Sequence, residues 1–136
     1  MEANVRWESG LTFEVAQEGH RYYIDVPDEA GTPTKGPRPK GLLLAGLGGC
    51  TAIDVVSILE KMRVKLDGLE VQVSAEAREE HPKIFTGIHV RYIFRGKDLP
   101  MDKLERAVKL SEDTYCGVSA MLRPAVPMTS EIVVEG

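Results

Sequence analysis

Two cysteines are the residues of this 136-residue chain most able to carry chemistry. Cys50 follows two glycines that leave space beside its sulfur, and Cys116 is followed by Gly117. Each thiol is either a small buried apolar group or a reactive nucleophile. A structural disulfide is not expected in a cytoplasmic protein of this size. Whether the fold brings the two sulfur atoms together is left open by their positions in the sequence.

On a helix, Cys50 shares one face with three polar residues further along the chain: Asp54, Ser57 and Lys61. This polar stripe either lines a pocket around the thiol or meets water. A carboxylate one turn away opposes ionisation of the thiol. A reactive Cys50 therefore requires a nearby cation, and Arg38 and Arg21 are the candidates.

The remaining ligand-forming residues do not predict a metal site. The three histidines, His20, His81 and His89, show no ligand spacing to one another or to the cysteines. Two cysteines are too few for a cysteine-rich zinc site. We therefore expect no bound metal.

The composition is typical of a globular protein of the cytoplasm. With 17 basic and 21 acidic residues the net charge is −4, so the basic surface of a nucleic-acid-binding protein is missing. No uninterrupted apolar run approaches the ~18 residues of a membrane span, and the charged first eight residues resemble no signal peptide. We expect a cytoplasmic single domain over residues 1–136 that binds neither nucleic acid nor membranes.

The spacing of apolar residues predicts an α+β fold. Three short strands form a meander, and a loop rich in proline and glycine leads into a long helix over 40–66. Two strands, a second helix with a further helical turn, and a last strand follow. The expected ranges are strands 5–8, 11–16 and 21–26, loop 27–39, strands 69–77 and 84–95, helices 98–114 and 118–122, and strand 130–135.

The helix over 40–66 also predicts a homodimer. It is apolar around most of its circumference and contains three internal glycines. Each glycine costs a helix about 1 kcal/mol relative to Ala, and close approach of a second backbone is the usual reason to keep it. Strands cover one side of this helix and leave the other open. We therefore expect antiparallel strands packed on a long buried central helix, with a second copy as the cover.

Three segments resemble the OsmC/Ohr family of peroxide-related thiol proteins, in particular its OsmC-like branch. They are residues 42–59 (LLLAGLGGCTAIDVVSIL), 78–86 (REEHPKIFT) and 115–122 (YCGVSAML). The resemblance extends over nearly the whole chain. It implies an OsmC-like fold and an intertwined homodimer with two equivalent sites at the subunit interface.

The resemblance also implies a reaction. Cys50 matches the peroxidatic cysteine of the family and Cys116 the resolving one, and together they reduce organic hydroperoxides without a metal or organic cofactor. A dithiol reductant then reopens the disulfide. The sequence departs from the family at residues 38–41 (RPKG), where a glutamate that orients a catalytic arginine is absent. We therefore expect a slow enzyme.

Two other functions fit the same fold. A non-enzymatic module would bind a small hydrophobic molecule at the dimer interface, and the absent glutamate favours it. A redox sensor would use a slow disulfide between Cys50 and Cys116 to change its interaction with a partner. Two observations distinguish the three functions: the distance between the two sulfur atoms, and which cation lies beside Cys50.

Overall fold

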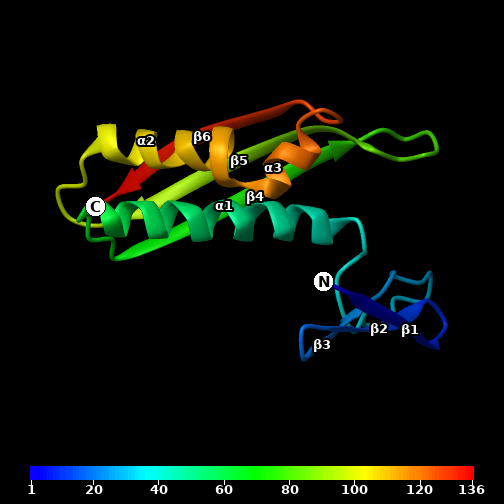
Figure 1. The fold of residues 1–136 in the computed structure, drawn as a ribbon. Helices are drawn as coiled ribbons and strands as arrows, with labels where there is room; N and C mark the ends of the chain where they lie inside the picture. The colour runs from blue at the N-terminus through cyan, green and yellow to red at the C-terminus, as the bar shows by residue number, and fades with distance from the viewer. The chain divides into compact units, whose positions relative to one another are not determined.

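The structure of the protein is a computed structural model that describes residues 1–136 (Figure 1). Its elements, in chain order, are β1 (Ala3–Ser9), β2 (Thr12–Gln17), β3 (His20–Ile24), α1 (Gly41–Lys61), β4 (Gly68–Ala77), β5 (Phe85–Arg95), α2 (Met101–Leu110), the π-helical turn η1 (Ser111–Tyr115), α3 (Gly117–Leu122) and β6 (Met128–Glu135). This is the α+β order predicted from the sequence.

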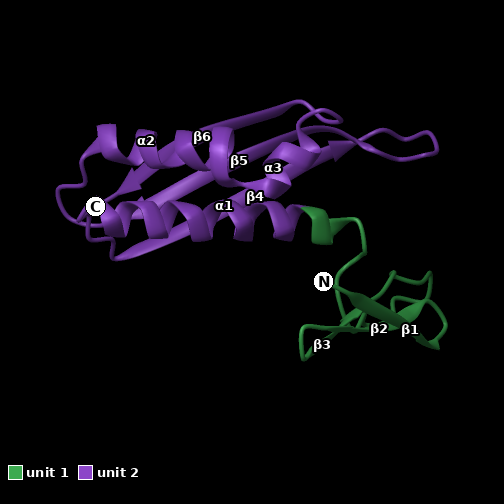
Figure 2. Ribbon diagram, in the orientation of Figure 1, with its two compact units in different colours: residues 1–43 green, residues 44–136 purple.

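The chain divides into two compact units, residues 1–43 and 44–136 (Figure 2). In the first unit, β1, β2 and β3 form the predicted antiparallel meander. β1 is exposed along its whole length, including the large side chains of Val5 and Trp7. This small sheet therefore presents apolar side chains that its own unit does not cover. The single domain expected over the whole chain stays a prediction.

In the second unit, β4, β5 and β6 form a three-stranded sheet. β4 and β5 are antiparallel, whereas β5 and β6 run parallel, so that Ile88 pairs with Met128 and Tyr92 with Ile132. The expectation of antiparallel strands does not hold for this last pair. The reason is that α2, η1 and α3 carry the chain back along the sheet before β6 begins, and parallel neighbours need such a crossover.

The helix α1 is continuous through its glycines and packs on the sheet by one stripe. Leu47, Val55 and Leu59 are fully buried and belong to one core cluster with the inward-facing side chains of β5. A Cβ atom at Gly48 would lie 3.0 Å from a methyl group of Val73 on β4. Glycine at this position therefore permits the close approach of helix and sheet.

By length and composition alone, α1 meets the description of a membrane-spanning helix, with 21 residues and a mean hydropathy of 2.0. Thr51 and Asp54 interrupt this stretch, so the expectation that no uninterrupted apolar run reaches the length of a membrane span stands. The buried stripe of α1 packs into the core of the second unit, as core helices of globular proteins do. Only 28% of its most apolar window is buried within the chain, and Ile53 and Val56 are exposed. The predicted central helix is thus buried on one side only in a single chain.

The helix α1 ends at Lys61, earlier than the expected residue 66. The N–H of Val64 donates to the carbonyl of Leu59 at 2.9 Å, and the N–H of Arg63 donates to that of Glu60 at 3.0 Å. These are the two hydrogen bonds of a Schellman closure, in which glycine usually occupies the left-handed position. Here that position is held by Arg63, with φ of 60°.

We expect Arg63→Gly to raise the free energy of unfolding by about 0.5–1 kcal/mol. A residue with a Cβ atom loses ~1–2 kcal/mol in the left-handed region, and the backbone entropy of glycine offsets part of the gain. Chemical denaturation measures the change. Arg63→Ala removes the same exposed side chain but keeps the strain, so it should not stabilise the protein. A less stable Arg63→Gly variant would contradict this account of the helix end.

Candidate functional site

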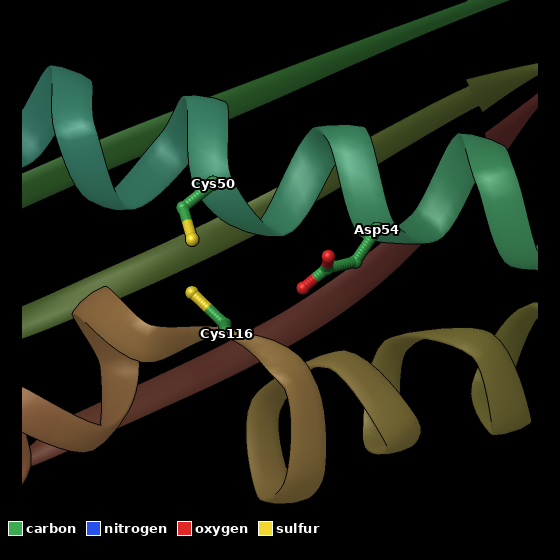
Figure 3. Close-up of side chains that lie close together, drawn as sticks. All are labelled: Cys50, Asp54 and Cys116. Carbon is green, nitrogen blue, oxygen red and sulfur yellow. The ribbon is translucent and has the colours of Figure 1, made fainter.

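The two cysteines, far apart in the sequence, face each other in the structure (Figure 3). Cys50 projects from the middle of α1, Cys116 lies between η1 and α3, and their side chains point toward one another. The two Sγ atoms and a carboxylate oxygen of Asp54 all lie within 4.8 Å of one another. Both cysteines are free thiols. The fold therefore brings together the two residues that the sequence singled out.

The helix α1 presents Cys50 beside its buried stripe. Thr51, the next residue, is 1% exposed and points into the core, while Cys50 and Asp54 are half-buried. The helical spacing of four places Asp54 on the same side as Cys50, as predicted. Ser57 and Lys61 are exposed. Of the predicted polar stripe, only Cys50 and Asp54 therefore lie at the pair of thiols.

A π-helical turn delivers Cys116 to this place. Its N–H donates to the carbonyl of Ser111 at 2.7 Å, the wide closure that defines a π-helix. In a regular α-helix, residues five apart point about 140° apart. The wider turn lets Ser111 and Cys116 both face α1. The expectation of one helix over 98–114 is corrected accordingly, since α2 ends at Leu110 and η1 follows.

A chain of hydroxyl groups ties these elements together beside the thiols. Ser111 Oγ donates to Asp54 Oδ2 at 2.9 Å and lies 2.7 Å from Thr51 Oγ1. Thr51 Oγ1 lies 2.9 Å from the hydroxyl of Tyr92, which donates to Glu112 Oε2 at 3.0 Å. The chain connects α1, β5 and η1. It therefore orients the Asp54 carboxylate next to the sulfurs.

This chain has four contacts but only three hydroxyl groups, each with one hydrogen to donate. Because Ser111 and Tyr92 donate to the carboxylates at the two ends, Thr51 donates to only one of its two hydroxyl neighbours. Burial raises the pKa of Tyr92, and the negative charge of Glu112 adds to the shift. Tyr92 accordingly keeps its proton and remains a donor.

Cys116 is the more buried of the two thiols, with 3% of its surface exposed. Its Sγ accepts a hydrogen bond from the N–H of Ser119 at 3.4 Å. Burial raises the pKa of the Cys116 thiol and the neighbouring Cys50 sulfur adds to the shift, while Ser119 opposes it. Cys116 is therefore hard to ionise and hard to reach, and Cys50 is the more accessible sulfur.

The two candidate cations for Cys50 both lie in the first compact unit. Arg21 is on β3 and forms an ion pair with Glu14 of β2. Arg38 is exposed in the segment that precedes α1. The identity of the cation that acts on Cys50 stays a prediction.

Sequence reasoning missed the roles of Thr51, Ser111 and Tyr92. Ser111 and Tyr92 were included there only as positions within the expected helix 98–114 and the expected strand 84–95. The sequence did contain a signal for these roles: each residue carries a hydroxyl group at a position where the apolar pattern predicts a side chain that points into the core. A buried hydroxyl needs a partner, so three of them on adjoining elements indicate a shared network.

Comparisons with known proteins assign the family. The family described as "OsmC-like protein" matches residues 31–131. The chain belongs to the OsmC-like family. This OsmC-like protein is similar in sequence to Protein YhfA of Escherichia coli (strain K12). The two are 42% identical over 130 residues, which cover 95% of this chain and 94% of that protein. The resemblance inferred from the three sequence segments is confirmed.

Solved structures share the fold of this OsmC-like protein. A hypothetical protein from Aquifex aeolicus VF5 superposes with a TM-score of 0.84 at 31% identity, covering 99% of this chain and 97% of that one. The organic hydroperoxide resistance protein OhrB of Bacillus subtilis superposes with a TM-score of 0.66 at 23% identity, covering 97% and 98%. The predicted OsmC-like fold, with two sheets and a central helix, is confirmed.

We expect Thr51→Val to lower the free energy of unfolding by about 1–3 kcal/mol. Valine keeps the shape of threonine but leaves the buried hydroxyl groups of Ser111 and Tyr92 with one partner fewer. Thr86→Val is the matched control, at an exposed position of β5 where water replaces the hydrogen bond from the Thr86 hydroxyl to the carbonyl of Glu76, and it should change stability by less than about 0.5 kcal/mol. Urea denaturation of both variants measures the difference. Equal losses would contradict a structural role for the hydroxyl chain.

Proposed function

We propose that this OsmC-like protein reduces organic hydroperoxides in the cytoplasm, with Cys50 as the attacking thiol and Cys116 as the resolving one. The observation that carries the proposal is the pair of free sulfurs within 4.8 Å of each other. One sulfur comes from a core helix and the other from the residue after a π-helical turn, and the turn is hydrogen-bonded to the helix through Thr51 and Ser111. Neither a metal nor an organic cofactor takes part in the reaction.

The first step oxidises Cys50. Its thiolate attacks one oxygen of the hydroperoxide, the O–O bond breaks, and the released alkoxide takes a proton and leaves as an alcohol. Cys50 becomes a sulfenic acid. The half-buried position of Cys50 supports this order of attack, because burial raises the pKa of the Cys116 thiol and limits access to it.

The second step forms the disulfide. The Cys116 sulfur attacks the sulfur of the Cys50 sulfenic acid, the S–O bond breaks, and hydroxide leaves as water with the Cys116 proton. A disulfide bond is about 2.05 Å long, so the sulfurs close by less than ~3 Å. An external dithiol then gives two electrons and two protons to the disulfide and is itself oxidised.

The rate depends on what counters the Asp54 carboxylate. Asp54 lies within 4.8 Å of both sulfurs and opposes a negative charge on either. The counter-charge stays a prediction, with Arg38 and Arg21 as the candidates, and residues 38–41 contain no glutamate to hold Arg38. The protein is therefore proposed to be slower than family members that have this glutamate.

Cumene hydroperoxide, added in equimolar amount to the reduced protein, should give a Cys50–Cys116 disulfide detected by peptide mass spectrometry. In Cys116→Ser, dimedone should trap Cys50 as a sulfenic acid, because no second thiol condenses with it. Cys50→Ser is the control and should show neither product. Dithiothreitol should restore both thiols of the wild type.

Two outcomes of that experiment favour other functions. If the wild type keeps both thiols while a hydroperoxide-resistance protein in the same buffer is oxidised, the enzyme proposal is wrong and the binding module takes its place. If the disulfide forms but the dithiol-driven reaction does not turn over, the redox sensor is the better description.

The same protein is proposed to act as a homodimer through the outward side of α1. Gly46 and Gly49 are exposed, and a Cβ atom at either would meet nothing within 4 Å. Nothing in the single chain therefore requires glycine at these helix positions, whereas a second backbone lying against them would. Ile53, 72% exposed, and Val56 extend this apolar side.

Light scattering should give the wild type twice the mass of one chain at micromolar concentration. Ile53→Glu should give the mass of one chain, because a charge buried between two apolar helices lacks a partner. Met101→Glu introduces the same charge at an exposed apolar position on α2 and should leave the dimer intact. A folded wild-type protein with the mass of one chain would contradict the dimer proposal.

A further inference from the structure

We infer that Cys50, Cys116 and Asp54 also form a zinc site, and that bound zinc keeps the two thiols reduced until a peroxide displaces it. Zinc binding itself follows from the geometry of these side chains. Its protective role rests on the proposed function, because it concerns the same two thiols. The sequence did not predict this site because its ligands come from two separate elements.

The three ligand atoms are already gathered for one ion (Figure 3). The two Sγ atoms and a carboxylate oxygen lie within 4.8 Å of one another. Zinc binds sulfur at about 2.3 Å and carboxylate oxygen at about 2.0–2.2 Å in tetrahedral sites, which places ligand atoms ~3.5–3.8 Å apart. Side-chain movements of about 1 Å bring the three ligand atoms to these distances. Two thiolates with one carboxylate suit zinc rather than magnesium or calcium.

The ligands also have the outer hydrogen bonds that orient a metal site. Ser111 Oγ donates to Asp54 Oδ2 at 2.9 Å, and Thr51 holds Ser111 at 2.7 Å. The N–H of Ser119 donates to Cys116 Sγ at 3.4 Å. Such partners align ligating carboxylates and thiolates before the ion arrives.

A buried hydroxyl group lies beside one of the proposed ligands. Ser119 is 1% exposed, its Oγ makes no hydrogen bond of regular geometry, and its side chain lies beside the Cys116 thiol and lowers the pKa of that thiol. A buried hydroxyl without a partner is uncommon. Three protein ligands leave one tetrahedral position for water, and a water bound there would supply the hydrogen bond that Ser119 lacks.

Zinc and peroxide compete for the same sulfurs. Two zinc-bound thiolates, one hydroperoxide and two protons give one disulfide, one alcohol and one water, and the zinc ion is released. The thiolates are the reductant and the peroxide is the oxidant. A disulfide has no thiolate to offer the metal, so oxidation empties the site.

The test titrates chelator-treated, phosphine-reduced protein with zinc alone, in competition with a chromophoric chelator. We expect one zinc per chain, and cobalt(II) in its place should give thiolate-to-metal charge-transfer absorption. Cys50→Ser and Cys116→Ser should abolish both signals. Asp54→Asn keeps both thiols and an oxygen for Ser111, and it should weaken zinc binding about tenfold or more. Equal zinc affinities of Asp54→Asn and the wild type would overturn the three-ligand site.

A second measurement separates this inference from the proposed function. Cumene hydroperoxide should oxidise the zinc-loaded wild type at least about tenfold more slowly than the zinc-free protein. At the same zinc concentration, Asp54→Asn should form its disulfide with little protection. Peroxide-driven disulfide formation with no zinc binding above the Cys50→Ser background would overturn the zinc site and leave the enzyme proposal standing. If the protein binds zinc but its zinc-free form is not oxidised by the peroxide, the zinc site is supported and the enzyme proposal is contradicted.

Discussion

The packing of α1 on β5 is the contact on which the rest of the second unit depends. Leu47, Val55 and Leu59 are fully buried along one stripe of the helix, and each contributes about 1.5–3 kcal/mol of burial. Thr51 lies in the same stripe, and its hydroxyl meets those of Tyr92 and Ser111. Apolar contacts alone tolerate some rotation of a helix, whereas a buried hydroxyl must find its partners. This hydrogen bonding therefore sets the rotation of α1 on the sheet.

The chemistry of the site follows from that rotation. With Thr51 turned into the core, Cys50 emerges at the edge of the stripe, where the π-helical turn brings Cys116. Asp54 has opposite effects on the pair. Its negative charge opposes a free thiolate, but the same carboxylate completes a set of ligands for a cation. On the two proposals, a protein with these three groups reacts slowly with peroxide and binds a metal, unless an arginine offsets the carboxylate.

A single chain leaves its two apolar surfaces incomplete. The outward side of α1 exposes Ile53 and Val56 next to glycines that no neighbour requires, and β1 exposes Trp7 in a sheet too small to have its own core. Three strands are stable when one face packs on something else. A second copy of the chain is proposed as the cover for the outward side of α1.

The sequence alone determined the order of the elements, the two cysteines as the chemical groups, and the place of Asp54 one helical turn from Cys50. These features depend on neighbours in the chain, whose periodicity and turn residues are local. Only the tertiary structure decided that β6 runs parallel to β5, that η1 widens the helix before Cys116, and that Thr51, Ser111 and Tyr92 form one network. Each of these depends on which distant elements meet. The distance between the two sulfurs belongs to the same class, because it is set by how α1 and η1 pack on the sheet and by no pattern within either segment.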